Sequence, residues 1–148
     1  MNEVNVSVLD LHAPRWLSKV PRFCQKVLQE IAVDEREVSV LLCSDSLIRD
    51  LNLRYRDCEA PTDVLSFLQQ DGSPVPDNRP LGDVVISLES AKRNARKFAV
   101  TYQEELKRLL VHGLLHLKGM DHEASQDPAA MLGLQDDIMS KLTEEKLF

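Results

Sequence analysis

The segment HGLLHLKGMDH, residues 112 to 122, holds three of the four histidines in this 148-residue chain. His112 and His116 are four residues apart, so they project from the same side of a helix. That helix is expected to run from Thr101 to Lys118, because Thr101 and Glu104 have the spacing of a capping box. Five leucines at helical spacing form its buried stripe: Leu106, Leu109, Leu110, Leu114 and Leu117. The two histidines lie along the edge of this stripe.

The end of the segment brings in a third histidine. Gly119 can adopt the left-handed conformation that ends a helix, and the chain can then turn back so that His122 approaches His112 and His116. Three imidazoles leave a fourth coordination position open for water, as in catalytic zinc sites. The alternative, three packed core histidines, fits this clustering poorly. The segment therefore predicts one Zn²⁺ per chain at the end of a core helix, and His12 is left unassigned.

The spacing of these histidines is also the metal-binding frame of the metzincin metalloproteases. Those proteases place a glutamate directly after the first histidine as general base, whereas this chain has Gly113 there. A peptidase must deliver a proton to the leaving amine. A phosphodiester leaves as an alkoxide, and zinc-bound water with its pKa lowered toward ~7 attacks with less help. Two alternatives stay open: a peptidase that uses Asp121 or Glu123 as base, and a non-catalytic protein with structural zinc.

The rest of the chain alternates between short apolar runs and helical patterns. Strands are predicted over residues 4–9, 37–44, 63–68 and 83–88, and a loop over 69–82. Further helices are predicted over residues 14–31, 44–57, 89–98 and 128–142. Strands and helices mix over one core, which predicts an α+β fold with one mixed, mostly parallel sheet and a single domain over residues 1–148.

The last predicted helix carries much of the acidity of the chain. Met131, Leu134, Ile138 and Leu142 have helical spacing and are expected to face the core. Residues 121–148 contain seven acids and two bases, a local charge of −5. The acids are expected to face solvent and to keep an RNA substrate on the opposite side of the molecule.

Composition indicates an ordinary globular protein, with 43% hydrophobic and 28% charged residues. No apolar run is long enough to span a membrane, and the first residues do not resemble a signal peptide. We therefore expect a cytoplasmic protein without a membrane partner. The cysteines are odd in number and far apart, which predicts reduced thiols; they are Cys24, Cys43 and Cys58.

The net charge of −6 does not exclude an anion-binding surface, because residues 91–108 contain six bases and two acids. Four of these bases share one face of the helix predicted over residues 89–98: Lys92, Arg93, Arg96 and Lys97. They form either a solvated face or a contact for RNA phosphates, which would give affinity without sequence choice.

Three segments together resemble one family. HGLLHLKGMDH is similar to the HGxLHLxGYDH signature of the YbeY family, bacterial and organellar endoribonucleases that act in ribosomal RNA maturation. LNLRYRDCEAPTDVLSF, residues 51–67, resembles that family's N-x-x-Y-R…P-T-D-V-L-S-F motif, and LGDVVIS, residues 81–87, resembles its L-G-D-I-x-I-S strand. Met120 stands where the family usually has tyrosine, and Leu68 where proline is common.

The resemblance implies a zinc-dependent, single-strand-specific endoribonuclease. Its role would be maturation of the small-subunit ribosomal RNA 3′ end and ribosome quality control. Its partners would be ribosomal RNA, the ribosomal small subunit and the assembly proteins of that subunit. The family's catalytic arginine maps onto Arg56, whose guanidinium would clamp a phosphate; the alternative is an ordinary arginine at a helix end. Asp83 and Asp121 are candidates to orient a ligand histidine, since such ligands usually donate their second N–H to an acceptor.

Overall fold

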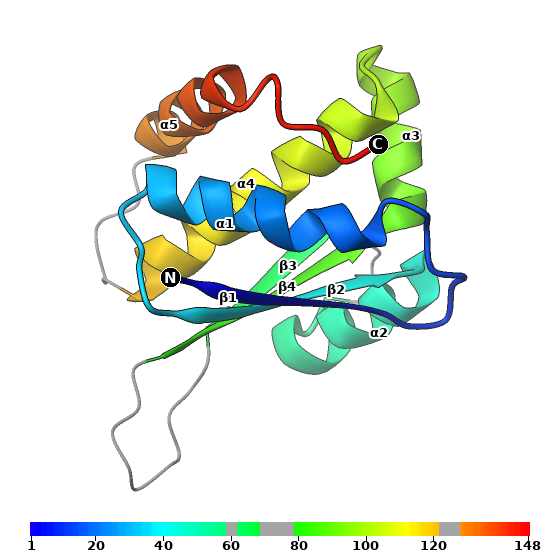
Figure 1. Cartoon of the computed structure of the whole chain (residues 1–148). Helices are drawn as coiled ribbons and strands as arrows, with labels where there is room; N and C mark the ends of the chain where they lie inside the picture. The colour runs from blue at the N-terminus through cyan, green and yellow to red at the C-terminus, as the bar shows by residue number, and fades with distance from the viewer. Residues whose placement is uncertain (59–61, 69–78, 122–127) are drawn as a thin grey trace, which may run out of the picture.

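The computed structural model describes residues 1–58, 62–68, 79–121 and 128–148, without the side chains of residues 120, 121 and 128. Within this part the chain forms a four-stranded sheet in the order β1-β2-β4-β3 (Figure 1). The strands are β1 (Glu3–Val8), β2 (Glu37–Cys43), β3 (Val64–Leu68) and β4 (Pro80–Ser87). β1 and β4 run parallel to β2, and β3 is an antiparallel edge strand. The predicted mixed, mostly parallel sheet is confirmed.

Helices cover both faces of the sheet (Figure 1). Their bounds are α1 (Val20–Glu30), α2 (Asp45–Arg56), α3 (Leu88–Phe98), α4 (Tyr102–Asp121) and α5 (Pro128–Lys141). α1 and α4 pack on one face, with α5 against α4, while α2 packs on the other face. On the α2 side, Ile48 joins Leu65 and Val85 in a small second core.

α4 is the central helix of the larger core. All five leucines of the predicted stripe are at most 2% exposed, which confirms the side on which the helix is buried. The capping prediction is also confirmed, because the Glu104 N–H donates to Thr101 Oγ1 at 3.1 Å. Capping and burial together set the rotation of α4, and so the direction in which its histidines project.

Two glycines let α4 lie directly on the sheet. A Cβ on Gly113 would come within 2.6 Å of Val84 Cγ1, and one on Gly82 would come within 2.7 Å of Leu117 Cδ2. Contacts that short do not occur between real side chains, so any larger residue would push α4 away from β4. The glycine that follows His112 is therefore a packing requirement of this fold.

Several element ends differ from those predicted. A short 3₁₀ turn, η1 (Leu17–Lys19), comes before α1, which begins at Val20 with Pro21 in its first turn. β4 begins at Pro80, inside the predicted loop, because its first residue pairs with Glu37 of β2. α4 continues through Gly119 to Asp121, so the prediction that Gly119 ends the helix is wrong. Glycine permits a helix end but does not enforce one.

The three cysteines all lie in the described part, and none forms a disulfide. Cys24 and Cys43 are buried, while Cys58 is exposed. Among the described residues, no helix combines the length and the apolar character that crossing a membrane requires.

Candidate active site

His112 and His116 lie together on α4, as their spacing predicts. Their ring centroids are 4.4 Å apart with 61° between the ring planes, and both side chains are half-buried. His122 lies outside the described residues. Within residues 1–58, 62–68, 79–121 and 128–148, no group of three His, Cys, Asp or Glu side chains is arranged to hold a metal ion. The three-histidine site therefore stays a prediction, of which the structure describes two members.

Gln135 of α5 fixes the orientation of His112. Its side chain is only 4% exposed, and its Oε1 lies 3.0 Å from His112 Nδ1. An amide oxygen can only accept, so this contact fits the tautomer in which Nδ1 carries the proton and Nε2 has the lone pair. Metal-binding histidines usually have this arrangement, in which the second ring nitrogen donates to an acceptor. Gln135 is not among the site residues predicted from the sequence.

Gln135 was missed because the helical spacing of α5 predicted the wrong residue for its inner face. Leu134 was expected to face the core but is 41% exposed, and Gln135 is buried in its place. Met131, Ile138 and Leu142 do pack inward. Both Leu134 and Gln135 have a spacing from these residues that would place them on the same side of the helix. The contact with His112 decides between them. α5 thus lies beside His112, with Asp136 and Asp137 exposed as predicted, while the expectation that its acids keep RNA on the opposite side of the molecule stays a prediction.

The surroundings of His116 favour its neutral form. Burial lowers the pKa of the imidazole, and electrostatic interactions with His112 and Arg56 lower it further. A neutral imidazole is the form that binds a metal ion.

Arg56 reaches this place from the opposite face of the sheet. It ends α2, and its Nη2 donates to the Ser66 carbonyl oxygen at 2.9 Å on the open edge of β3. Its guanidinium also lies 5.8 Å from the centre of the Phe67 ring. Ser66 Oγ in turn donates to the Gly113 carbonyl oxygen at 3.1 Å, in the turn of α4 between the two histidines. Ser66 thus links Arg56, whose side chain is exposed, to the turn of α4 that carries His112 and His116.

Asp83 does not join this group. Its neighbours on β4, Gly82 and Val84, both face α4. Side chains alternate along a strand, so Asp83 lies on the α2 face, where it accepts a hydrogen bond from Ser39. Burial raises the pKa of its carboxyl group. The prediction that Asp83 orients His112 or His116 is wrong for this reason, and the side chain of Asp121 lies outside the described part.

The basic face of α3 is exposed but remote from the histidines. Arg93 pairs with Asp45 at 2.6 Å and so ties α3 to the start of α2. Lys92 lies 5.5 Å from the centre of the Tyr102 ring, at the first residue of α4. With a rise of about 1.5 Å per residue, that end is about 21 Å from His116. Contact of Lys92, Arg93, Arg96 and Lys97 with RNA stays a prediction.

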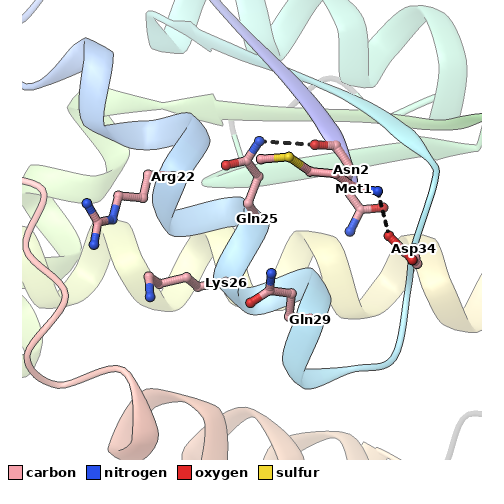
Figure 2. A pocket seen from close by; sticks show the side chains of 7 residues that line it. All are labelled: Met1, Asn2, Arg22, Gln25, Lys26, Gln29 and Asp34. Carbon is pink, nitrogen blue, oxygen red and sulfur yellow. Dashed lines mark hydrogen bonds and ion pairs between the residues drawn. The ribbon is translucent and has the colours of Figure 1, made fainter.

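A polar pocket of about 150 Å³ lies between α1 and the first residues of the chain (Figure 2). Gln25 Nε2 donates to the Asn2 carbonyl oxygen at 3.0 Å, and the Met1 amine pairs with Asp34 at 3.0 Å. These polar groups satisfy one another. The pocket offers no imidazole or thiol, so the histidine pair with Arg56 is the better candidate site.

The fold and the site together define a small α+β protein in which two imidazoles on a buried helix lie beside an arginine at the sheet edge. A sequence model described as "Endoribonuclease YbeY" matches residues 3–143 of the chain. The chain belongs to the YbeY family.

Similar proteins agree with this assignment over most of the chain. The "Endoribonuclease YbeY" of Treponema pallidum is 41% identical over 145 residues, which cover 95% of this chain and 90% of the relative. The protein of that name from Persephonella marina is 44% identical over 119 residues, which cover 80% and 78%. A solution structure of a Thermotoga maritima protein matches with a TM-score of 0.61 at 25% identity, covering 97% of this chain and 91% of that one.

Proposed function

We propose that the chain is a zinc-dependent, single-strand-specific endoribonuclease. Its substrate would be ribosomal RNA at the 3′ end of the small-subunit transcript. Its setting would be small-subunit maturation and quality control in the cytoplasm, together with the assembly proteins of the subunit. The proposal is supported by the chain of contacts from Arg56 through Ser66 to Gly113, which lies between His112 and His116, in a family named for endoribonuclease activity.

Zinc would be held by His112, His116 and His122. The donor set suits this metal, because imidazole is a preferred zinc ligand and Gln135 leaves Nε2 of His112 free to bind. When bound, zinc supplies Lewis acidity, which lowers the pKa of water and polarises a phosphoryl oxygen. Gln135 holds the His112 ring in one tautomer and one orientation.

Arg56 would bind the phosphate. Two of its neighbours, the Ser66 carbonyl oxygen and the Phe67 ring, hold the guanidinium at the open edge of β3. A planar guanidinium presents paired N–H donors to two phosphate oxygens, and it balances the negative charge that grows as the bond to the leaving oxygen breaks.

A peptidase fits the site less well. Gly113 occupies the position of the protease glutamate, and a Cβ there would collide with Val84. Ser66 Oγ would lie only 3.4 Å from the same Cβ. No longer side chain fits between α4 and β4 without moving the helix, so a base cannot be placed there as it is in the metzincins.

The deciding experiment tests one protein preparation on three substrates: single-stranded RNA, duplex RNA and casein. Untagged protein purified without chelators should contain about one zinc ion per chain. It should cut single-stranded RNA, leave a duplex of the same sequence largely intact, and leave casein uncut. Cleavage of casein that disappears on removal of the metal would overturn the proposal in favour of a peptidase. A metal-loaded protein that cuts no substrate would favour the non-catalytic alternative.

The role given to Gln135 predicts a change in metal affinity. In Gln135→Leu the N–H of His112 loses its acceptor, and loss of such a partner typically weakens metal binding about 10- to 100-fold. Competition with a chromophoric chelator would measure the zinc dissociation constant. Gln135→Glu keeps an acceptor and should keep most of the affinity, and Gln29→Leu on the exposed side of α1 is the control. Equal zinc affinity in Gln135→Leu and the wild type would show that the contact does not support the ligand.

A further inference from the structure

Tyr55 is a large exposed aromatic residue beside the proposed phosphate-binding arginine. It precedes Arg56 in the last turn of α2, and 62% of its surface is exposed. Its ring meets the Phe67 ring edge-on, with 5.4 Å between centroids and 64° between planes. The Arg56 guanidinium lies over the same Phe67 ring at 5.8 Å. Phe67 therefore supports an exposed aromatic ring and a cation side by side.

This arrangement is joined to α4 across the edge strand, because Ser66 faces α4 while its neighbour Phe67 faces α2. Ser66, next to Phe67, contacts α4 through Gly113 and accepts the hydrogen bond from Arg56. The Arg56 guanidinium at this edge thus lies between α4 on one face of the sheet and the Tyr55 and Phe67 rings on the α2 face. A chain that placed one phosphate on Arg56 would run its neighbouring nucleotide past Tyr55.

We propose that Tyr55 is a stacking surface for an unpaired base of the RNA substrate, next to the phosphate held by Arg56. The inference rests on the proposed function and adds a subsite to it. Every base has a flat face that stacks on an aromatic side chain, and such stacking does not depend on sequence. Bases inside a duplex are already stacked on one another, so only a single strand can offer a free face.

The exposure of Tyr55 indicates that its ring serves to bind a base and not only to pack against Phe67. A tyrosine that served only to pack against Phe67 would gain stability by burying more of its ring, because burial of apolar surface is favourable. Here Phe67 touches the ring edge-on and leaves most of it in solvent. A ring held at a fixed angle loses little conformational freedom when a base stacks on it.

The test measures binding to oligonucleotides that differ only in their bases. The probes are a single-stranded 2′-O-methyl oligonucleotide, an abasic oligonucleotide of equal length and charge, and a duplex. Dissociation constants come from fluorescence anisotropy, and a denaturing gel after each titration checks that the probe is uncut. The proteins are wild type, Tyr55→Ala, Tyr55→Phe and Leu53→Ala. Leu53→Ala is the matched control, because it also truncates an exposed side chain of α2.

Tyr55→Ala should weaken binding of the base-containing single strand about 10-fold or more, the usual effect of removing one stacking ring. It should leave binding of the abasic probe and of the duplex unchanged. Tyr55→Phe keeps the ring and should bind like the wild type, as should Leu53→Ala. Melting temperatures of all four proteins check that α2 is intact.

Two results would overturn the inference while leaving the proposed function in place. One is wild-type affinity of Tyr55→Ala for the base-containing strand, with cleavage of RNA retained. The other is an equal loss for the base-containing and abasic probes, which would mean that Tyr55 acts by positioning Arg56. A wild-type protein that neither binds nor cuts single-stranded RNA would instead contradict the proposed function itself, and the inference with it.

Discussion

His116→Ala is expected to remove the zinc ion and to abolish RNA cleavage. The residue is one of three proposed ligands, and its neutral imidazole is held next to His112 at 4.4 Å between ring centroids. Two remaining ligands bind zinc far more weakly than three, so the metal content should fall from about one ion per chain to nearly none. Loss of metal catalysis removes several kcal/mol of transition-state stabilisation, which slows cleavage about 10³-fold or more.

Elemental analysis and a single-turnover cleavage assay on the same preparation would measure both effects. His12→Ala is the matched control, because His12 is exposed on another part of the chain and should keep both zinc and activity. A circular dichroism melt shows whether α4 still folds, since the neighbouring leucines remain buried. Full zinc content in folded His116→Ala would remove this histidine from the metal site.

Arg56→Ala is expected to slow cleavage at saturating RNA by about 10²–10³-fold, the usual loss for one charge-stabilising donor. Zinc content should not change, because the described contacts of the guanidinium are with Ser66 and Phe67. The structure adds one expectation that the sequence did not. Loss of the hydrogen bond to the Ser66 carbonyl should lower the free energy of unfolding by about 1 kcal/mol.

Two further variants separate charge from geometry. Arg56→Lys should recover only part of the rate, since an ammonium group cannot make the paired contact of a guanidinium. Arg54→Ala removes another exposed arginine from the last turn of α2 and should cleave like the wild type. A wild-type rate in Arg56→Ala would exclude the residue from catalysis. Loss of zinc along with the rate would show that Arg56 supports the fold of the site, and the basic face of α3 would be the next candidate for phosphate.

The sequence alone determined those features that depend on residues close together in the chain. The Thr101 cap and the leucine stripe of α4 follow from spacings of three and four residues, and the structure has both. The pairing of His112 with His116 follows from the same helical repeat. The mixed sheet was predictable from the alternation of strand and helix patterns, and the family from three short motifs in the right order.

Only the tertiary structure decided which distant residues meet at the site. Gln135 reaches His112 across 23 positions of sequence because α5 packs on α4 with this residue inward, although Leu134 had the more apolar side chain. Asp83 lies on the α2 face because the two glycine contacts seat α4 over its neighbours on β4. Arg56 is linked to the histidine helix through Ser66 because β3 is the edge strand, which leaves the Ser66 carbonyl free to accept from it. Short sequence patterns do not predict such contacts, because strand order and helix rotation depend on how the whole core packs.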